Sequence, residues 1–81
     1  MEQNQLLERI VVSPEIMVGK PVIKGTRLSV QYVLNLLAHG ASTDEIIQEY
    51  DQLRNEDILA CLLYASQMLE DISFMPLIKA V

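Results

Sequence analysis

The sequence predicts a mainly α-helical fold, in which a short N-terminal β-ribbon precedes a three-helix bundle. Residues 9–27 hold two short β-branched runs, each bounded by proline or glycine, which is typical of strands. Residues 29–69 instead carry apolar side chains at the 3.6-residue period of an α-helix. With 81 residues, the chain is expected to form a single domain near the lower size limit for independent folding.

The two predicted strands are too short to form a stable sheet alone. The first covers residues 9–13 and stops at Pro14, and the second covers residues 20–23. A lone two-stranded ribbon is marginal in water, so we expect these strands to pair with those of a second chain. The predicted dimer interface therefore includes Ile10, Val12, Val22 and Ile23.

Capping residues divide the helical part into short helices. Ser29 is placed to cap a first helix, which Gly40 ends in a left-handed turn. Ser42 and Glu45 have the spacing of a capping box, which predicts a second helix that ends at Tyr50. Helix, tight turn and helix in this order indicate a homeodomain-like helix-turn-helix bundle.

The third predicted helix, from Asn55 or Glu56 to Leu69, is apolar on two faces. One face is enough to pack on the other helices, which leaves Leu59 and Leu63 as further dimer contacts. Residues 70–81 form an apolar tail that either folds over this second face or leaves it to another chain. The tail offers candidate anchors for a partner protein, namely Phe74, Met75, Leu77 and Ile78.

Charge is unevenly distributed along the chain, whose formal net charge is −5. Residues 1–27 contain four basic and three acidic residues, whereas residues 28–81 contain two basic and eight acidic ones. Nucleic-acid binding depends largely on neutralising phosphates, so this balance disfavours a generic nucleic-acid binder. An acidic helical body with one basic loop favours a protein partner instead.

The basic loop is the best candidate for contact with phosphate or nucleic acid. It offers the cations Lys20, Lys24 and Arg27 and the hydroxyl of Thr26, and its glycines allow close approach of the backbone to a phosphate. Its alternative interpretation is a structural turn, with Arg27 paired to an acidic helix.

Base contacts are expected from the start of the third helix. Arg54 and Asn55 have side chains that read bases, whereas Glu56 and Asp57 would repel the phosphate backbone.

Several other functions are not expected. A single cysteine, Cys61, excludes a disulfide within the chain, and one histidine, His39, leaves too few ligands for a metal site. No residues converge into a catalytic set, so we expect neither an enzyme nor a cofactor. The longest apolar run, residues 58–65, is far shorter than a membrane span, and we expect a cytoplasmic protein that makes no membrane contact.

Residues 19–27, Gly-Lys-Pro-Val-Ile-Lys-Gly-Thr-Arg, with Val30 after them, resemble the signature of the family called domain of unknown function 433. The resemblance extends over about residues 9–66. It implies a helix-turn-helix protein that acts as the antitoxin of a bacterial or archaeal type II toxin–antitoxin pair, with a ribonuclease-like toxin as partner. Asp51 and Arg54 depart from the proline and threonine frequent at these positions of the family.

Three hypotheses follow. In the first, the chain is a dimeric antitoxin that neutralises its toxin by protein–protein contacts through the tail. In the second, it is a DNA-binding autoregulator that holds operator DNA with the basic loop, Arg54 and Asn55. In the third, it is a homo-oligomeric structural module with neither activity.

Overall fold

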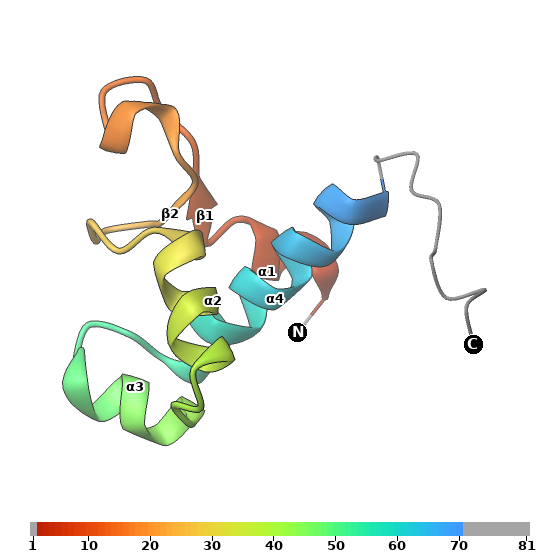
Figure 1. The fold of residues 1–81 in the computed structure, drawn as a ribbon. Coiled ribbons are helices and arrows are strands. Elements are labelled where there is room, and N and C mark those ends of the chain that lie inside the picture. Colours follow the sequence, from red (N-terminus) through yellow and green to blue (C-terminus); the bar gives the residue numbers. More distant parts are fainter. Residues whose placement is uncertain (1, 71–81) are drawn as a thin grey trace, which may run out of the picture.

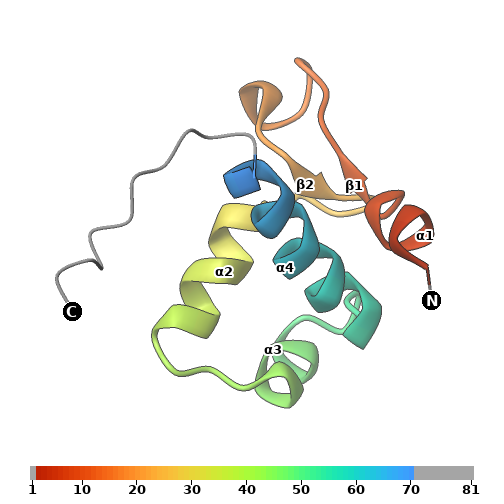
Figure 2. The ribbon, with the colours of Figure 1, turned by 90° about the vertical axis from the view of Figure 1, so that its right-hand side faces the viewer.

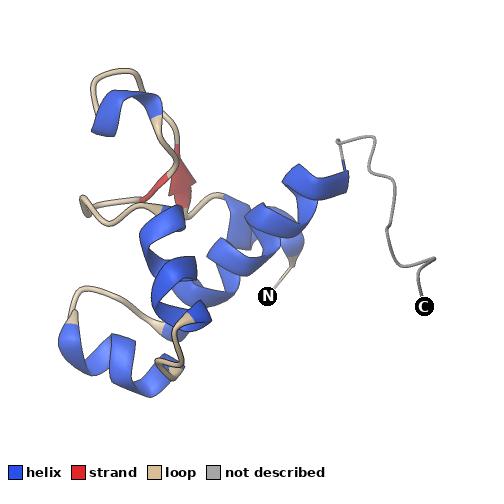
Figure 3. Ribbon diagram, in the orientation of Figure 1, coloured by secondary structure: helices blue, strands red, loops and turns tan. Residues whose placement is uncertain are grey.

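A computed structural model describes residues 2–70 and shows a small helical bundle with a two-stranded ribbon near its N-terminus (Figures 1 and 3). The elements in chain order are α1 (Gln3–Leu7), β1 (Ile10–Val11), the 3-10 turn η1 (Met17–Gly19), β2 (Val22–Ile23), α2 (Val30–Ala38), α3 (Thr43–Glu49) and α4 (Asn55–Glu70). The predicted fold class is therefore confirmed. The proposed anchors Phe74, Met75, Leu77 and Ile78 lie outside the described residues.

The ribbon pairs within one chain rather than between chains. β1 and β2 are antiparallel, with Ile10 opposite Ile23 and Val11 opposite Val22, and a further bridge joins Val22 to Ser29. Because β2 lies between these two partners and faces the helices, Val22 and Ile23 are each only 1% exposed. The prediction that these two residues form a dimer interface is therefore wrong.

Ile10 and Val12, the other two ribbon residues of the predicted interface, differ in their burial. Ile10 is half-buried and packs against the hydrophobic core of its own chain. Val12 follows β1 and remains exposed. The paired residues of β1 and β2 therefore offer little apolar surface to a second chain.

The core forms where the ribbon meets the three main helices. Its fully buried members come from β2, α2, α3, the α3–α4 turn and α4, and are Ile23, Val30, Val33, Ile46, Leu53, Ile58 and Cys61. Each of these elements is too short to be stable alone, so packing around this cluster holds them in place.

Local signals set the ends of α2 and α3 as the sequence predicts. The Ser29 hydroxyl accepts a hydrogen bond from the Tyr32 amide at 3.0 Å, and α2 ends before Gly40, which has φ +98°. At α3, the Ser42 hydroxyl accepts from the Glu45 amide at 3.1 Å, and the Glu45 carboxylate accepts from the Ser42 amide at 2.8 Å. The predicted capping box is confirmed.

Helix α1, which the sequence analysis did not predict, packs against α4 (Figure 2). Its leucines, Leu6 and Leu7, are half-buried. Because α1 and the core cover different parts of α4, much of the apolar surface of α4 is enclosed within one chain. The C-terminal half of α4 nevertheless extends beyond α2 (Figure 1).

Candidate functional site

The basic loop is the tip of a tight hairpin that continues from β2. The Ile23 amide donates to the Leu28 carbonyl at 2.9 Å, which closes the loop over residues 24–27. Gly25 lies in this loop with φ +82°, a conformation that suits glycine. The Lys24 amide donates to the Arg9 carbonyl at 2.7 Å, so the loop is also fixed to the residue before β1.

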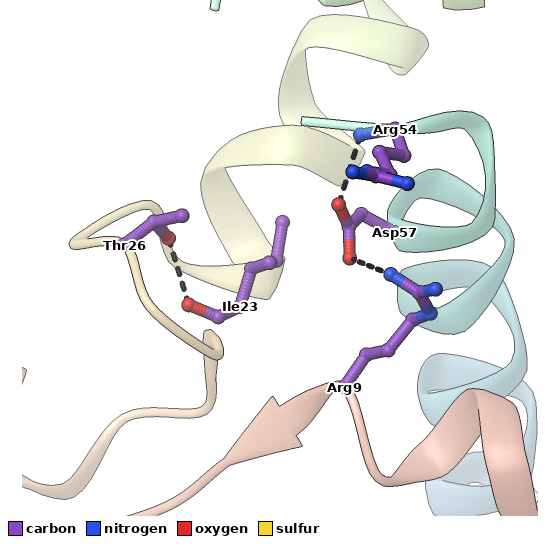
Figure 4. A network of polar contacts seen from close by, with 5 residues as sticks. All are labelled: Arg9, Ile23, Thr26, Arg54 and Asp57. Carbon is purple, nitrogen blue, oxygen red and sulfur yellow. Dashed lines mark hydrogen bonds and ion pairs between the residues drawn. The ribbon is translucent and has the colours of Figure 1, made fainter. Parts of the chain in front are cut away.

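Thr26 belongs to this turn rather than to a ligand site. Its hydroxyl donates to the Ile23 carbonyl at 2.8 Å and accepts from the Leu28 amide at 3.0 Å (Figure 4). A phosphate oxygen is an acceptor and would need the one proton that the hydroxyl already donates. The prediction of Thr26 as a phosphate contact is therefore replaced by a structural role.

A buried carboxylate fixes the start of α4. Asp57 Oδ1 accepts from Arg9 Nη1 at 3.0 Å, and Asp57 Oδ2 accepts from the Arg54 amide at 2.9 Å (Figure 4). Asp57 is only 6% exposed. The expectation that Asp57 would repel a phosphate backbone is wrong, because its charge is buried and paired with Arg9.

Lys24 lies beside the start of α4, and Arg27 lies beside the end of α3. Lys24 lines a hollow of about 410 Å³ with Arg9 and Asp57. Arg27 lines a second hollow, of about 640 Å³, with Tyr50 at the end of α3. Lys24 and Arg27 are both exposed, and neither forms a salt bridge with any of residues 2–70. The alternative in which Arg27 pairs with an acidic helix of its own chain is not observed there.

The remaining predicted contacts divide between two places. Arg54 and Asn55 are exposed at the start of α4, beside which Lys24 also lies. Lys20 instead lines a groove of about 220 Å³ with Leu34 of α2 and Met68 in the C-terminal half of α4. The structure therefore places Lys24, Arg54 and Asn55 at the start of α4, Arg27 beside the end of α3, and Lys20 elsewhere.

The two tyrosines of the bundle join α2 to the end of α3. The hydroxyl oxygens of Tyr32 and Tyr50 are 2.6 Å apart, and their rings meet edge to face at 6.1 Å. The hydrogen bond with Tyr32 raises the pKa of Tyr50 above its usual value. This pair therefore positions one wall of the hollow that Arg27 lines.

The lone thiol is not suited to chemistry. Cys61 is fully buried, and this burial, with a smaller contribution from the negative charge of Asp57, raises its pKa to about 12. A thiol at this pKa does not supply a thiolate nucleophile near neutral pH. Among the described residues, no three His, Cys, Asp or Glu side chains gather as metal ligands would.

An acidic surface surrounds α3. Residues 43–53 contain no lysine or arginine, and their four carboxylate residues, Asp44, Glu45, Glu49 and Asp51, are all exposed. Glu45 and Glu49 also edge an apolar hollow of about 260 Å³, which is lined by Leu36, Ala41, Ile46 and Tyr50. We call this hollow, with Glu45 and Glu49 at its edge, the acidic notch.

The outer face of α4 is apolar and exposed. Leu59, Leu62 and Leu69 are 44%, 47% and 63% exposed, whereas Leu63 is half-buried. Of the two dimer contacts predicted on this helix, Leu59 is thus the more accessible. In the part of the chain that the structure describes, no helix has the length and apolarity to cross a membrane.

Comparisons with known proteins support the resemblance to the domain of unknown function 433 family. A family model described as "Protein of unknown function (DUF433)" matches residues 10–65. An uncharacterized protein of Archaeoglobus fulgidus is 67% identical over 24 residues, which cover 30% of this chain and 67% of that protein.

A solved structure is similar over most of the fold. The crystal structure of a DUF433 member protein from Anabaena variabilis superposes with a TM-score of 0.74 at 28% identity. The match covers 83% of this chain and 66% of that one, so this chain spans just under two thirds of its relative. Because the family model matches more than half of its residues, the chain belongs to the DUF433 family.

Proposed function

We propose that this chain is an antitoxin-like protein that neutralises a ribonuclease-like toxin by protein–protein binding. The acidic notch is the observation that carries the proposal. Two exposed carboxylates at the edge of an apolar hollow, with two more exposed within residues 43–53, suit a surface that presents arginine or lysine beside apolar side chains. A groove that binds RNA has this character, because it must attract phosphates.

The rest of the chain is consistent with a protein partner. The net charge of −5 repels the phosphates of nucleic acid and attracts a basic enzyme. The apolar tail of residues 70–81, which begins at the end of α4, supplies side chains that serve as anchors in protein interfaces. In this proposal the chain covers the groove of its toxin, so that RNA no longer enters.

The test uses the protein encoded beside this chain in its genome. That protein is expressed alone and together with this chain in a host cell, and growth and RNA integrity are measured. We expect growth arrest and RNA cleavage from the neighbour alone, and recovery of both when this chain is present. If the neighbour neither harms the host nor co-purifies with this chain, the proposal fails.

A second candidate is an autoregulator that binds its own promoter. It is favoured by the positions of the predicted phosphate and base contacts around the start of α4. Lys24 lies beside the start of α4, where Arg54 and Asn55 are exposed, and Arg27 lies beside the turn that leads into α4. Pairing of Asp57 with Arg9 also removes one carboxylate from the surface that DNA would approach. Loop cations would hold phosphates while the other two side chains reach base edges.

A mobility-shift assay with the promoter fragment tests this candidate at low salt, with and without the neighbouring protein. Binding that weakens steeply as salt increases is the expected result. The absence of a shift under both conditions would exclude promoter binding but would leave toxin neutralisation intact, so the two candidates fail separately. A homo-oligomer without either activity would pass neither test.

A further inference from the structure

The exposed face of α4 has a regular pattern that neither toxin binding nor DNA binding explains. Residues 55, 59, 62, 66 and 69 are spaced alternately by four and three positions, and all five are exposed. This spacing is that of the a and d positions of a coiled coil, which place one continuous stripe along a helix. We call this stripe the α4 seam; it consists of Asn55, Leu59, Leu62, Ser66 and Leu69.

The seam is distinct from the surfaces that the chain itself covers. Asp57, Ile58, Ala60 and Cys61 are buried on other sides of α4. The three seam leucines are all about half exposed or more. Three large apolar side chains in one straight stripe are more than isolated surface residues, and such a stripe indicates an interaction surface.

We propose that the α4 seam binds the same seam of a second copy of this chain, with the two α4 helices antiparallel. Antiparallel pairing about a two-fold axis near Tyr64 places Leu59 opposite the partner's Leu69 and Leu62 opposite the partner's Ser66. The pattern is therefore self-complementary, as the single contact patch of a closed dimer must be.

Side-chain sizes favour this direction over a parallel one. In the antiparallel register, Leu62 fills the space above the partner's Ser66. In a parallel register, Ser66 would face the partner's Ser66 and leave a gap, while Leu62 would crowd the partner's Leu62. Well-packed interfaces avoid such gaps, because the atoms that line them lose contacts.

The size of the contact is adequate for a dimer. α4 has 16 residues, so it is about 24 Å long and about 10 Å wide. Two such helices in contact along their length bury on the order of 1,000 Å² in total, which is about the minimum for a specific interface. The helix extends beyond α2 at its C-terminal half, where a second copy has access to it (Figure 1).

The charges within and beside the seam predict how its association responds to salt. The seam contains no charged residue, so it offers nothing specific to a basic toxin or to a phosphate backbone. Its flanks hold Glu56 and Glu70, and antiparallel pairing brings Glu56 near the partner's Glu70. Because these like charges repel, association should strengthen as salt is added. This interface requires neither a toxin nor DNA.

Sedimentation of the full chain over a concentration series tests the interface. We expect a monomer–dimer equilibrium, and we expect Leu62→Glu to weaken it by at least about 30-fold, as a central interface residue would. Val12→Glu is the matched control, because it places the same charge on an exposed apolar residue of the ribbon. A monomer at all concentrations, or a dimer that Val12→Glu disrupts and Leu62→Glu does not, would overturn the proposal.

Disulfide trapping tests the direction of the helices. Leu62→Cys and Ser66→Cys are prepared separately, mixed and oxidised; the native Cys61 is fully buried and does not compete. We expect efficient cross-linking only in the mixture. Equal cross-linking of Ser66→Cys alone would show parallel helices and contradict the proposed pairing. Circular dichroism confirms that each variant is folded.

Discussion

Arg9 and Asp57 lie 48 residues apart in the sequence, yet Arg9 Nη1 donates to Asp57 Oδ1 at 3.0 Å. This ion pair joins the residue before β1 to the first turn of α4 (Figure 4). Through its other oxygen, Asp57 also accepts from the Arg54 amide. One carboxylate thus connects the ribbon, the α3–α4 turn and α4, the helix that begins at the predicted base contact Asn55.

Removal of Arg9 should therefore destabilise the fold. Asp57 is 6% exposed, so Arg9→Gln would leave a nearly buried carboxylate without its cation. Because the Arg9 side chain is itself partly exposed, we expect a loss of about 2 kcal/mol in the free energy of unfolding, less than for a fully buried pair. Urea denaturation measures this loss. The control Arg27→Gln replaces an exposed arginine and should change the free energy of unfolding by less than about 0.5 kcal/mol.

The turn that holds the basic loop should depend on the hydroxyl of Thr26. Thr26→Val keeps the side-chain shape but leaves the Ile23 carbonyl and the Leu28 amide without this partner. We expect a loss of about 1 to 2 kcal/mol in unfolding free energy. Thr26→Ser retains the hydroxyl and should lose less than half as much. If Thr26→Ser is destabilised and Thr26→Val is not, the methyl group rather than the hydrogen bonds supports the turn.

The buried thiol predicts a loss of stability in alkali. Burial raises the pKa of Cys61 to about 12, whereas an unfolded cysteine titrates near about 8.5. Between these values the unfolded chain releases a proton that the folded chain retains, so stability falls as the pH rises.

The Cys61→Ala variant isolates this effect from the titration of other groups. Relative to Cys61→Ala, the native chain should lose up to about 1.4 kcal/mol of unfolding free energy per pH unit between about pH 9 and about pH 11. Urea denaturation across this range measures both chains. Parallel pH profiles would mean that Cys61 is not shielded from water.

The position of each loop cation predicts its effect on promoter binding. Lys24 lies beside the start of α4 and Arg27 beside the α3–α4 turn, whereas Lys20 lies near Met68. Lys24→Ala and Arg27→Ala should each reduce the dependence of log affinity on log salt by about 1. Lys20→Ala should leave this slope unchanged. Mobility shifts at several salt concentrations measure the slope, and an equal effect of all three substitutions would contradict the grouping.

Much of the helical fold could be predicted from the sequence because its signals are local. Ser29, Gly40 and the Ser42–Glu45 capping box act on backbone groups within a few residues, so their effect does not depend on tertiary contacts. Helix α1 has only a weak local signal, the Glu2 amide donating to Gln5 Oε1 at 3.3 Å. It has five residues and persists by packing on α4, which is distant in the sequence.

The candidate site was less predictable because its residues have partners far along the chain. The Asp57 carboxylate looked like part of an acidic helix start, and only the folded chain brings Arg9 to it. Val22 and Ile23 looked like interface residues because the pairing of β2 with β1 and with Ser29 was not anticipated. Thr26 looked free because its hydrogen bonds depend on the turn that it stabilises.

The most direct test of the proposed function is calorimetric titration of this chain into the purified protein that is encoded beside it in the genome. We expect a tight complex that Glu49→Lys, in the acidic notch, weakens by at least tenfold, as loss of a close charge pair does. Glu15→Lys makes the same charge change on an exposed residue outside the notch and should leave the affinity unchanged. Absence of binding, or equal weakening by the two substitutions, would contradict a role of the acidic notch in toxin neutralisation.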